Sequence, residues 1–269
     1  MSDRKPLPQA PLISRKDIIE SAELISQKFA KIRGRHPAHL FTINFELIYE
    51  DCLYPEYEFD FDDDCDLGCD EDGEQIYGAF EPESNCICVD RSLNNPAELL
   101  GRKKTFTIWH EVGHAILHRG WILSQARQRG IKRLTDTELS IEPDVESNLE
   151  RQANLFAGRA GAPTWFLDYV LSETFSLRTR QLRYTGPGRY GFYVRGFDTQ
   201  YSISSFAHFC AVAAYHVRDR FGGLSVEALS YRVAESRLVL DLGPKPSKGK
   251  PFRFHRSASR RVLSLRVSA

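Results

Sequence analysis

Apolar residues recur at helical spacing near both ends of the chain. Residues 16–31 are predicted to form a helix, with apolar positions at Ile18, Ile19, Ala22, Leu24, Ile25 and Phe29. Residues 205–220 are predicted to form another, with apolar positions at Phe206, Phe209, Val212, Ala213 and Val217. Gly222 and Gly223 would end that helix, and Ser225 can cap a short one after it. This shape is helix-turn-helix-like, but its exposed bases are few, and two helices can pack in this way without binding DNA.

Two more helices are predicted in the middle of the chain. The first has apolar positions at Phe106, Trp109, Val112, Ile116 and Leu117. The segment Asn95-Pro96-Ala97-Glu98 is typical of a helix start, and Arg119-Gly120 is typical of a stop. The second helix covers residues 147–157, with its apolar stripe at Leu149, Ala153, Phe156 and Ala157. Both helices are therefore expected to bury one face.

Residues 55–92 have the pattern of a few strands. Cys86 and Cys88 alternate with Ile87 and Val89, which is ordinary for a strand. No Lys or Arg occurs in this interval before Arg91, and a solvated acidic loop is predicted at Asp62, Asp63, Asp64, Asp66, Asp70, Glu71, Asp72 and Glu74. Together, the helices and strands predict an α+β fold with a small β-sheet.

The composition is that of a globular protein, and its charges give no strong overall electrostatic field. The chain has 36 Lys and Arg against 36 Asp and Glu, so its net charge selects neither nucleic acid nor membrane. The sequence shows no signal peptide and no apolar span of transmembrane length, which predicts a cytoplasmic protein with reduced cysteines. Residues 243–269 are predicted to form a flexible basic tail, and nucleic-acid contact is expected only through it.

The cysteines allow a second interpretation. Cys65 and Cys69 could form a zinc site with Cys86 and Cys88, but their C-x3-C and C-x-C spacings differ from the paired C-x2-C of common zinc sites. Strand packing is therefore favoured for Cys86 and Cys88, and core packing for Cys210.

The segment His110-Glu111-Val112-Gly113-His114 carries the strongest chemical signal. On a helix, His110 and His114 lie one turn apart on one face, so both imidazoles can reach one metal ion at ~2.0–2.1 Å. Glu111 would then lie beside the open position of the metal, where it can accept a proton from a water. This is the H-E-x-x-H arrangement of zinc hydrolases.

A catalytic zinc site needs a third protein ligand. His118 continues the even spacing, but it lies about two turns from His110, roughly 12 Å along the helix axis. The extended zincin pattern places its third His six residues after the second, beyond a Gly, whereas here the gap is four. His118 is therefore expected at the helix end or behind the ligands.

The predicted helix over residues 147–157 offers a better third ligand. Glu150 and Asn154 share a face beside its apolar stripe, where an unpaired carboxylate would be costly. Two alternatives stay open on the residues alone: Glu146 is a rival ligand one turn earlier, and Glu150 could pair with Arg151 instead of a metal.

The two motifs resemble a known family. Residues 106–118, FTIWHEVGHAILH, resemble the metal-binding helix of the ImmA/IrrE family of metallo-endopeptidases. Residues 150–157, ERQANLFA, resemble its second signature, a glutamate four residues before Asn-x-Phe-Ala. The resemblance implies Glu150 as the third ligand. Weaker likenesses lie at residues 43–50, 88–93 and 224–233.

The resemblance implies a zincin-like fold, in which the metal helix and the second ligand helix pack on a small β-sheet. It gives a metallopeptidase domain over residues 1–170 and a C-terminal helical subdomain with an insertion over 171–242. In one departure from the family, Gly158 to Pro163 replace an apolar run that ends in Met-Pro, and this bears on the shape of the substrate cleft.

The implied activity is that of a zinc-dependent metallo-endopeptidase. His110, His114 and Glu150 would hold the metal, with Glu111 as the catalytic base and Mn²⁺ or Fe²⁺ as alternatives to zinc. The implied substrate is a DNA-binding helix-turn-helix repressor, cut in a stress or mobile-element response. The alternative is a non-catalytic metal-binding regulator that binds a repressor or another protein. Possible oxyanion stabilisers are Tyr184, Tyr190, Tyr193, His208 and His216.

Overall fold

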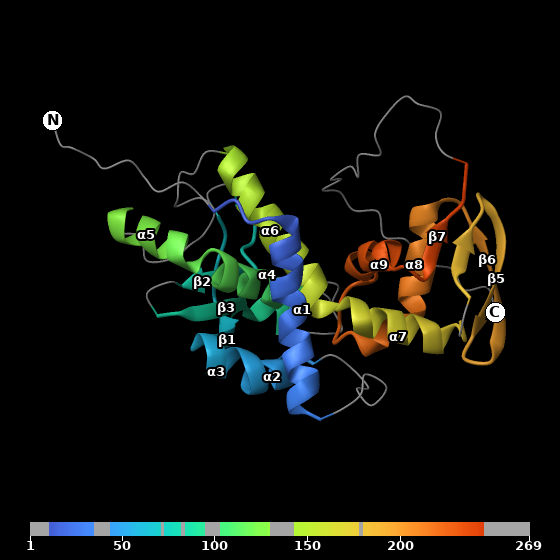
Figure 1. The fold of residues 1–269 in the computed structure, drawn as a ribbon. Helices are drawn as coiled ribbons and strands as arrows, with labels where there is room; N and C mark the ends of the chain where they lie inside the picture. Colours follow the sequence, from blue (N-terminus) through green and yellow to red (C-terminus); the bar gives the residue numbers. More distant parts are fainter. Residues whose placement is uncertain are drawn as a thin grey trace.

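Helices and short strands make up the computed structural model, which describes residues 11–34, 44–70, 73–81, 84–94, 103–129, 143–177 and 180–244 (Figure 1). The helices are α1 (Arg15–Ile32), α2 (Phe45–Ile48), α3 (Tyr54–Tyr57), α4 (Lys104–Leu117), α5 (Arg119–Arg129), α6 (Pro143–Gly161), α7 (Thr164–Thr174), α8 (Phe206–Val217) and α9 (Val226–Glu235), with the turns η2 (Tyr49–Leu53), η3 (Arg91–Asn94) and η5 (Arg218–Arg220). The strands are β1 (Asp60–Cys65), β2 (Gly78–Glu81), β3 (Cys86–Asp90), β4 (Leu182–Tyr184), β5 (Gly188–Val194), β6 (Phe197–Ile203) and β7 (Val239–Asp241). The α+β prediction is confirmed.

A three-stranded sheet supports the middle of the molecule. Its order is β1–β3–β2, with β1 parallel and β2 antiparallel to β3. Ile87 and Val89 of β3 are fully buried on the face that α4 covers. Beyond α4 lies α6, and α1 packs against α6 in turn (Figure 1). The two helices with the predicted ligands are therefore neighbours, and one of them rests on the sheet.

The acidic run corrects one prediction. Part of the predicted solvated loop is strand β1, because Asp60, Asp62 and Asp64 alternate on its exposed side. Phe61 points the other way and packs on Phe45, with ring centroids 5.0 Å apart. Acidic residues are depleted in strands, but they are tolerated where one face meets water. Alternation therefore decided the structure of this segment, although its composition suggested a loop.

Serine hydroxyls cap the starts of two helices, and the cap at Ser225 was predicted. The Ser14 hydroxyl accepts a hydrogen bond from the Asp17 amide at 3.2 Å, and α1 runs as predicted. The Ser225 hydroxyl likewise accepts from the Ala228 amide at 3.1 Å and starts α9. Helix α8 also lies where it was predicted.

The boundaries of the metal helix differ from the prediction. Helix α4 begins at Lys104, and the predicted start at residues 95–98 lies outside the described residues. The predicted stop at Arg119-Gly120 lies within two residues of the observed end at Leu117, but a further helix that was not predicted, α5, begins at Arg119. The Ile122 amide donates to the His118 carbonyl at 2.9 Å, and Ile122 is fully buried. Burial of Ile122 outweighs the weak helix preference of Gly120.

The C-terminal part holds more strand than predicted. Strands β5 and β6 form an antiparallel hairpin around Arg195 and Gly196, which have φ of 48° and 93°, and β4 pairs in parallel with β7. The predicted boundary between residues 170 and 171 falls inside α7. Among the described residues, none of the helices is both long and apolar enough to cross a membrane. The basic tail beyond residue 244 lies outside the described residues.

Candidate metal centre

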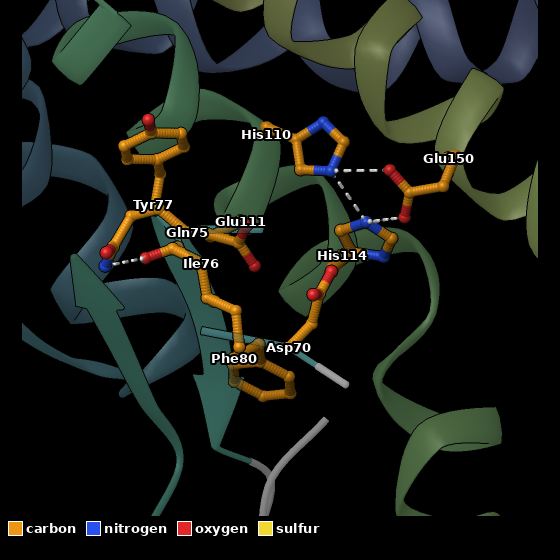
Figure 2. A pocket seen from close by; sticks show the side chains of 10 residues that line it. Asp70, Gln75, Ile76, Tyr77, Phe80, His110, Glu111, His114 and Glu150 are labelled. Carbon is orange, nitrogen blue, oxygen red and sulfur yellow. Dashed lines mark hydrogen bonds and ion pairs between the residues drawn. The ribbon is translucent and has the colours of Figure 1, made fainter. Parts of the chain in front are cut away.

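Two helices bring the three predicted ligands together (Figure 2). On α4, the Nε2 atoms of His110 and His114 are 3.0 Å apart. From α6, Glu150 places Oε2 at 3.1 Å from His110 Nε2 and Oε1 at 3.0 Å from His114 Nε2. The three side chains are 10% to 25% exposed, so they are largely buried and still reach the pocket that they line.

The spacing of these atoms fits a metal ion. Within the described ranges, His110, His114 and Glu150 form the group of His, Cys, Asp or Glu side chains whose ligand atoms lie within 4.8 Å of one another. Ligands ~2.0–2.1 Å from a tetrahedral ion stand about 3.3–3.4 Å apart. The measured separations of 3.0–3.1 Å are slightly shorter, so a small outward shift would admit the ion. Two imidazoles and one carboxylate also match the donors of catalytic zinc sites.

Each histidine has a second partner that fixes its orientation. His110 Nδ1 lies 3.2 Å from Asn154 Oδ1, so Nδ1 donates to the amide oxygen and Nε2 faces Glu150. His114 Nδ1 lies 3.1 Å from His118 Nδ1, and His118 Nε2 lies 3.4 Å from Gln152 Oε1. Burial and the charge of His114 lower the pKa of His118 to about 3, so His118 is a neutral acceptor. His118 therefore lies behind His114 and outside the group of three, which agrees with its expected place behind the ligands.

The charge of the cluster favours a cation. Burial disfavours the carboxylate, but hydrogen bonds from His110 and His114 lower the pKa of Glu150. Burial also disfavours the charged form of His110, but the hydrogen bond to Glu150 and the charge of Glu111 raise its pKa to about 9. A position that stabilises a proton on His110 has a negative potential, and the same potential attracts a metal cation.

The alternatives for Glu150 have different outcomes. Arg151 donates to Asn148 Oδ1 at 2.8 Å, while Glu150 pairs with the two histidines. Glu146 lies one turn earlier on α6, and its side chain is outside the described part of the chain. The pairing of Glu150 with Arg151 is therefore not found, while the choice of Glu150 over Glu146 as ligand stays a prediction.

Gly113 sets the distance between the two ligand helices. A Cβ at this position would meet Phe156 Cδ1 at 3.2 Å and the Ala153 Cα at 3.3 Å. The backbone of α4 can therefore approach α6 closely only because residue 113 has no side chain. This close approach lets a ligand on α6 reach two ligands on α4.

The ligands open onto a cavity of about 200 Å³, with ten residues in its lining: Asp70, Gln75, Ile76, Tyr77, Gly78, Phe80, His110, Glu111, His114 and Glu150 (Figure 2). Glu111 is 8% exposed and follows His110 on α4. A Cβ on Gly78 of β2 would meet Glu111 Oε1 at 2.7 Å, so Gly78 makes room for this carboxylate. The predicted base therefore lies between the edge strand and the ligand cluster.

The sequence did not predict the residues of the cavity wall opposite the ligands. None of the five predicted oxyanion stabilisers is in the lining of this cavity, whereas Tyr77 is. Those five belong to the C-terminal part; for example, Tyr190 donates to the Gly186 carbonyl at 2.6 Å, and His216 lies 2.8 Å from the Tyr201 hydroxyl. Tyr77 directly precedes β2, so the pairing of β2 with β3 is the signal that could have found it.

The comparisons with known proteins add no relative to this geometry. No protein-family model, no curated protein and no solved structure matches the chain. The resemblance to the ImmA/IrrE family therefore rests on the two sequence motifs, and the site rests on the positions of its own side chains.

Proposed function

We propose that this chain is a metal-dependent endopeptidase. The observation that carries the proposal is the convergence of His110 Nε2, His114 Nε2 and the Glu150 carboxylate at 3.0–3.1 Å, with Glu111 in the same cavity. These residue types match the catalytic zinc sites of peptidases, which use two His and one Glu. The ligands have their own second partners, as functional metal sites generally do.

The residues have distinct roles in this proposal. His110, His114 and Glu150 hold the ion, while Asn154 and His118 keep the imidazoles in the tautomer that presents Nε2. A divalent ion such as Zn²⁺, when bound, polarises a peptide carbonyl and makes water a stronger nucleophile. The Glu111 carboxylate accepts the proton of the attacking water and then gives it to the departing amide nitrogen.

The edge of the sheet suits an extended peptide. Strand β2 is the last strand on its side of the sheet, and Gly78 and Phe80 of β2 line the cavity. An extended substrate segment can add to a free strand edge through main-chain hydrogen bonds. The resemblance to the ImmA/IrrE family adds the substrate class, a helix-turn-helix repressor whose cleavage changes transcription.

The test is cleavage of candidate repressors by the full chain. Helix-turn-helix proteins encoded next to this gene are incubated with the Zn²⁺-loaded protein, and new termini are identified by mass spectrometry. We expect one or a few cleavage sites in one repressor with the wild type. With Glu111→Gln, which keeps the shape of the side chain but cannot accept the proton, we expect cleavage to be at least ~10²-fold slower.

The matched control is Glu20→Gln on the exposed side of α1, which should cleave like the wild type. Equal cleavage by Glu111→Gln would contradict the proposed base. Tight binding of a repressor by both proteins without cleavage would instead identify a non-catalytic regulator.

A further inference from the structure

Three cysteines gather on the side of the sheet that faces away from α4. Ile87 and Val89 of β3 enter the core under α4, so Cys86 and Cys88 point to the opposite face. The Sγ atoms of Cys86 and Cys88 are 4.0 Å apart. Cys65, at the end of β1, is the third thiol, and all three are free.

The third thiol shares this face of the sheet, because Cys65 pairs in register with Asp90, two residues beyond Cys88. Burial and a hydrogen bond to Cys88 raise the pKa of the Cys65 thiol to about 12. The hydrogen bond with Cys86, together with burial, raises the pKa of Cys88. Cys88 is therefore the middle member of the group, and it is 4% exposed. Cys69 stands apart from this group, with its Sγ 3.8 Å from Gln75 Oε1.

The strand pairing surrounds these thiols with acids. Asp60 of β1 and Glu81 of β2 flank Cys86 on its two sides, and Asp62 is the partner of Cys88 in β1. Residues paired in register share a face of the sheet. Carboxylates beside a thiol oppose its ionisation unless a cation is present. The negative charge of this face therefore suits a bound cation.

The geometry favours a metal ion over a disulfide. Thiolates bound to one tetrahedral zinc ion at ~2.3 Å stand about 3.8 Å apart, close to the 4.0 Å between Cys86 and Cys88. Residues two apart on a strand have Cα atoms about 6.4–6.8 Å apart, at the upper limit of what a disulfide spans. The three Sγ atoms do not all lie within 4.8 Å of one another in this structure, so the Cys65 side chain has to turn about its one χ torsion to reach an ion held by Cys86 and Cys88.

We propose that Cys65, Cys86 and Cys88 form a second metal site, for a thiophilic d¹⁰ cation such as Zn²⁺ or Cu⁺. This site lies on the far side of the sheet from the His110 cluster and does not depend on the proposed peptidase activity. It also has a structural consequence. Cys65 is the last residue of β1, and the segment that follows it leads to the cavity residues Asp70 and Gln75. An ion held by Cys65 would therefore anchor the start of the segment that forms the cavity wall.

The test uses Cd²⁺ as the probe on the reduced full-length protein. Thiolate coordination gives a sulfur-to-Cd²⁺ charge-transfer absorption in the ultraviolet, which the His110–His114–Glu150 cluster cannot give because it has no sulfur ligand. We expect this absorption to rise to a plateau as Cd²⁺ is added and to disappear when excess EDTA removes the Cd²⁺. Cys86→Ser, Cys88→Ser and Cys65→Ser should each weaken Cd²⁺ binding by more than ~100-fold, beyond the loss typical of an outer partner.

Two controls separate this site from the rest of the chain. Cys69→Ser, at an exposed thiol, and His110→Ala, in the other cluster, should leave the absorption unchanged. Circular dichroism checks that each variant folds, and Cys86→Ser, at a half-buried position, decides if Cys88→Ser does not fold. The proposal is overturned if the wild type gives no such absorption, or if Cys86→Ser keeps it at full strength.

Discussion

Helix α6 carries two clusters of charged side chains that differ in how their charges are balanced. Towards its start, Glu150 faces His110 and His114. Towards its end, Arg159 lies 2.8 Å from Glu235 and 3.7 Å from Glu23. Arg232 of α9 adds a second contact to Glu235 at 2.5 Å. We call this second group the arginine cluster, with Glu23, Arg159, Arg232 and Glu235 as its members.

The difference separates a structural cluster from the one that we propose to be functional. The arginine cluster sets two guanidinium groups against two carboxylates, so the protein supplies both signs of charge. The metal centre sets Glu111 and Glu150 beside imidazoles that are neutral when they bind a metal. Its remaining negative charge calls for a cation from outside. A cluster of buried charged groups is therefore a stronger indication of function when the charges that the chain supplies to it do not cancel.

The sharpest test of this comparison exchanges one glutamate for glutamine in each cluster. Glu111→Gln should lower the cleavage rate by ~10²–10⁴-fold, because it removes the proton acceptor, and should keep the metal. Glu235→Gln should leave the rate near that of the wild type. The readouts are the initial cleavage rate and the metal content of both variants. Comparable losses of rate in the two would remove the functional distinction.

Removal of the third ligand tests the metal centre itself. Glu150→Ala should weaken Zn²⁺ binding by about 4 kcal/mol, or ~10³-fold, because a site built around a charged ligand loses that ligand. Competitive titration with a chromophoric chelator measures the affinity. Glu146→Ala, one turn earlier on the same helix, is the control and should keep the ion. If the two variants exchange these results, the ligand is one helical turn away from the proposed position.

Arg159→Met tests the arginine cluster. The side chain of Arg159 is 11% exposed, and its loss leaves Glu23 and Glu235 with Arg232 as their remaining partner in the cluster. We expect the free energy of unfolding to fall by about 3 kcal/mol, with Zn²⁺ affinity unchanged. Urea denaturation measures this, with Lys16→Met in an exposed pair as a control that should stay within ~0.5 kcal/mol. A weaker metal site with unchanged stability would contradict the assignment.

A smaller loss of Zn²⁺ affinity is expected when Asn154, the hydrogen-bond partner of His110, is removed. Asn154→Ala should weaken Zn²⁺ binding by ~10–100-fold, because the imidazole loses the hydrogen bond that orients it. Asn148→Ala removes a residue of the same type from α6, where Asn148 contacts Arg151. That control should bind Zn²⁺ like the wild type. Equal affinities in the two variants would show that Asn154 does not orient His110.

Lowering the pH should progressively remove the stability that the arginine cluster contributes. Burial opposes ionisation of Glu235, but Arg159 and Arg232 lower its pKa below the usual value of 4.5. A depressed carboxyl pKa adds stability that is present above the unfolded value and is lost as pH falls through the folded value. The urea midpoint should therefore drop more for the wild type than for Glu235→Gln between pH 5 and pH 3 (about the range of ordinary carboxyl titration). Parallel pH profiles would contradict this.

The sequence predicted the three ligands of the proposed metal centre better than it predicted the other residues of the cavity. His110 and His114 are tied by helical periodicity, and Glu150 was placed on the correct face of its helix by the stripe around Ala153. Both inferences use contacts within one helix, which sequence spacing fixes. The position of Tyr77 in the cavity depends on how β2 pairs with β3, which no local pattern encodes.

The same distinction explains the errors in the fold. Arg119-Gly120 has the local features of a helix stop, but burial of Ile122 continues the chain into α5. Strand β1 has the composition of a loop, and its pairing with β3 fixes it as a strand. In both places a tertiary contact outweighed a local preference. The spacing of residues along one sequence does not show which distant residues come into contact.

The close approach at Gly113 limits how far the H-E-x-x-H motif can vary in this chain. A methyl group at this position would have to move Phe156 or the backbone of α6 by a few tenths of an ångström. The motif formally allows any residue at its fourth position. In this chain that position, Gly113, determines how closely the two helices can approach and takes no part in the chemistry. A search pattern that accepts any residue there would also accept chains in which a side chain at this position holds the two helices farther apart.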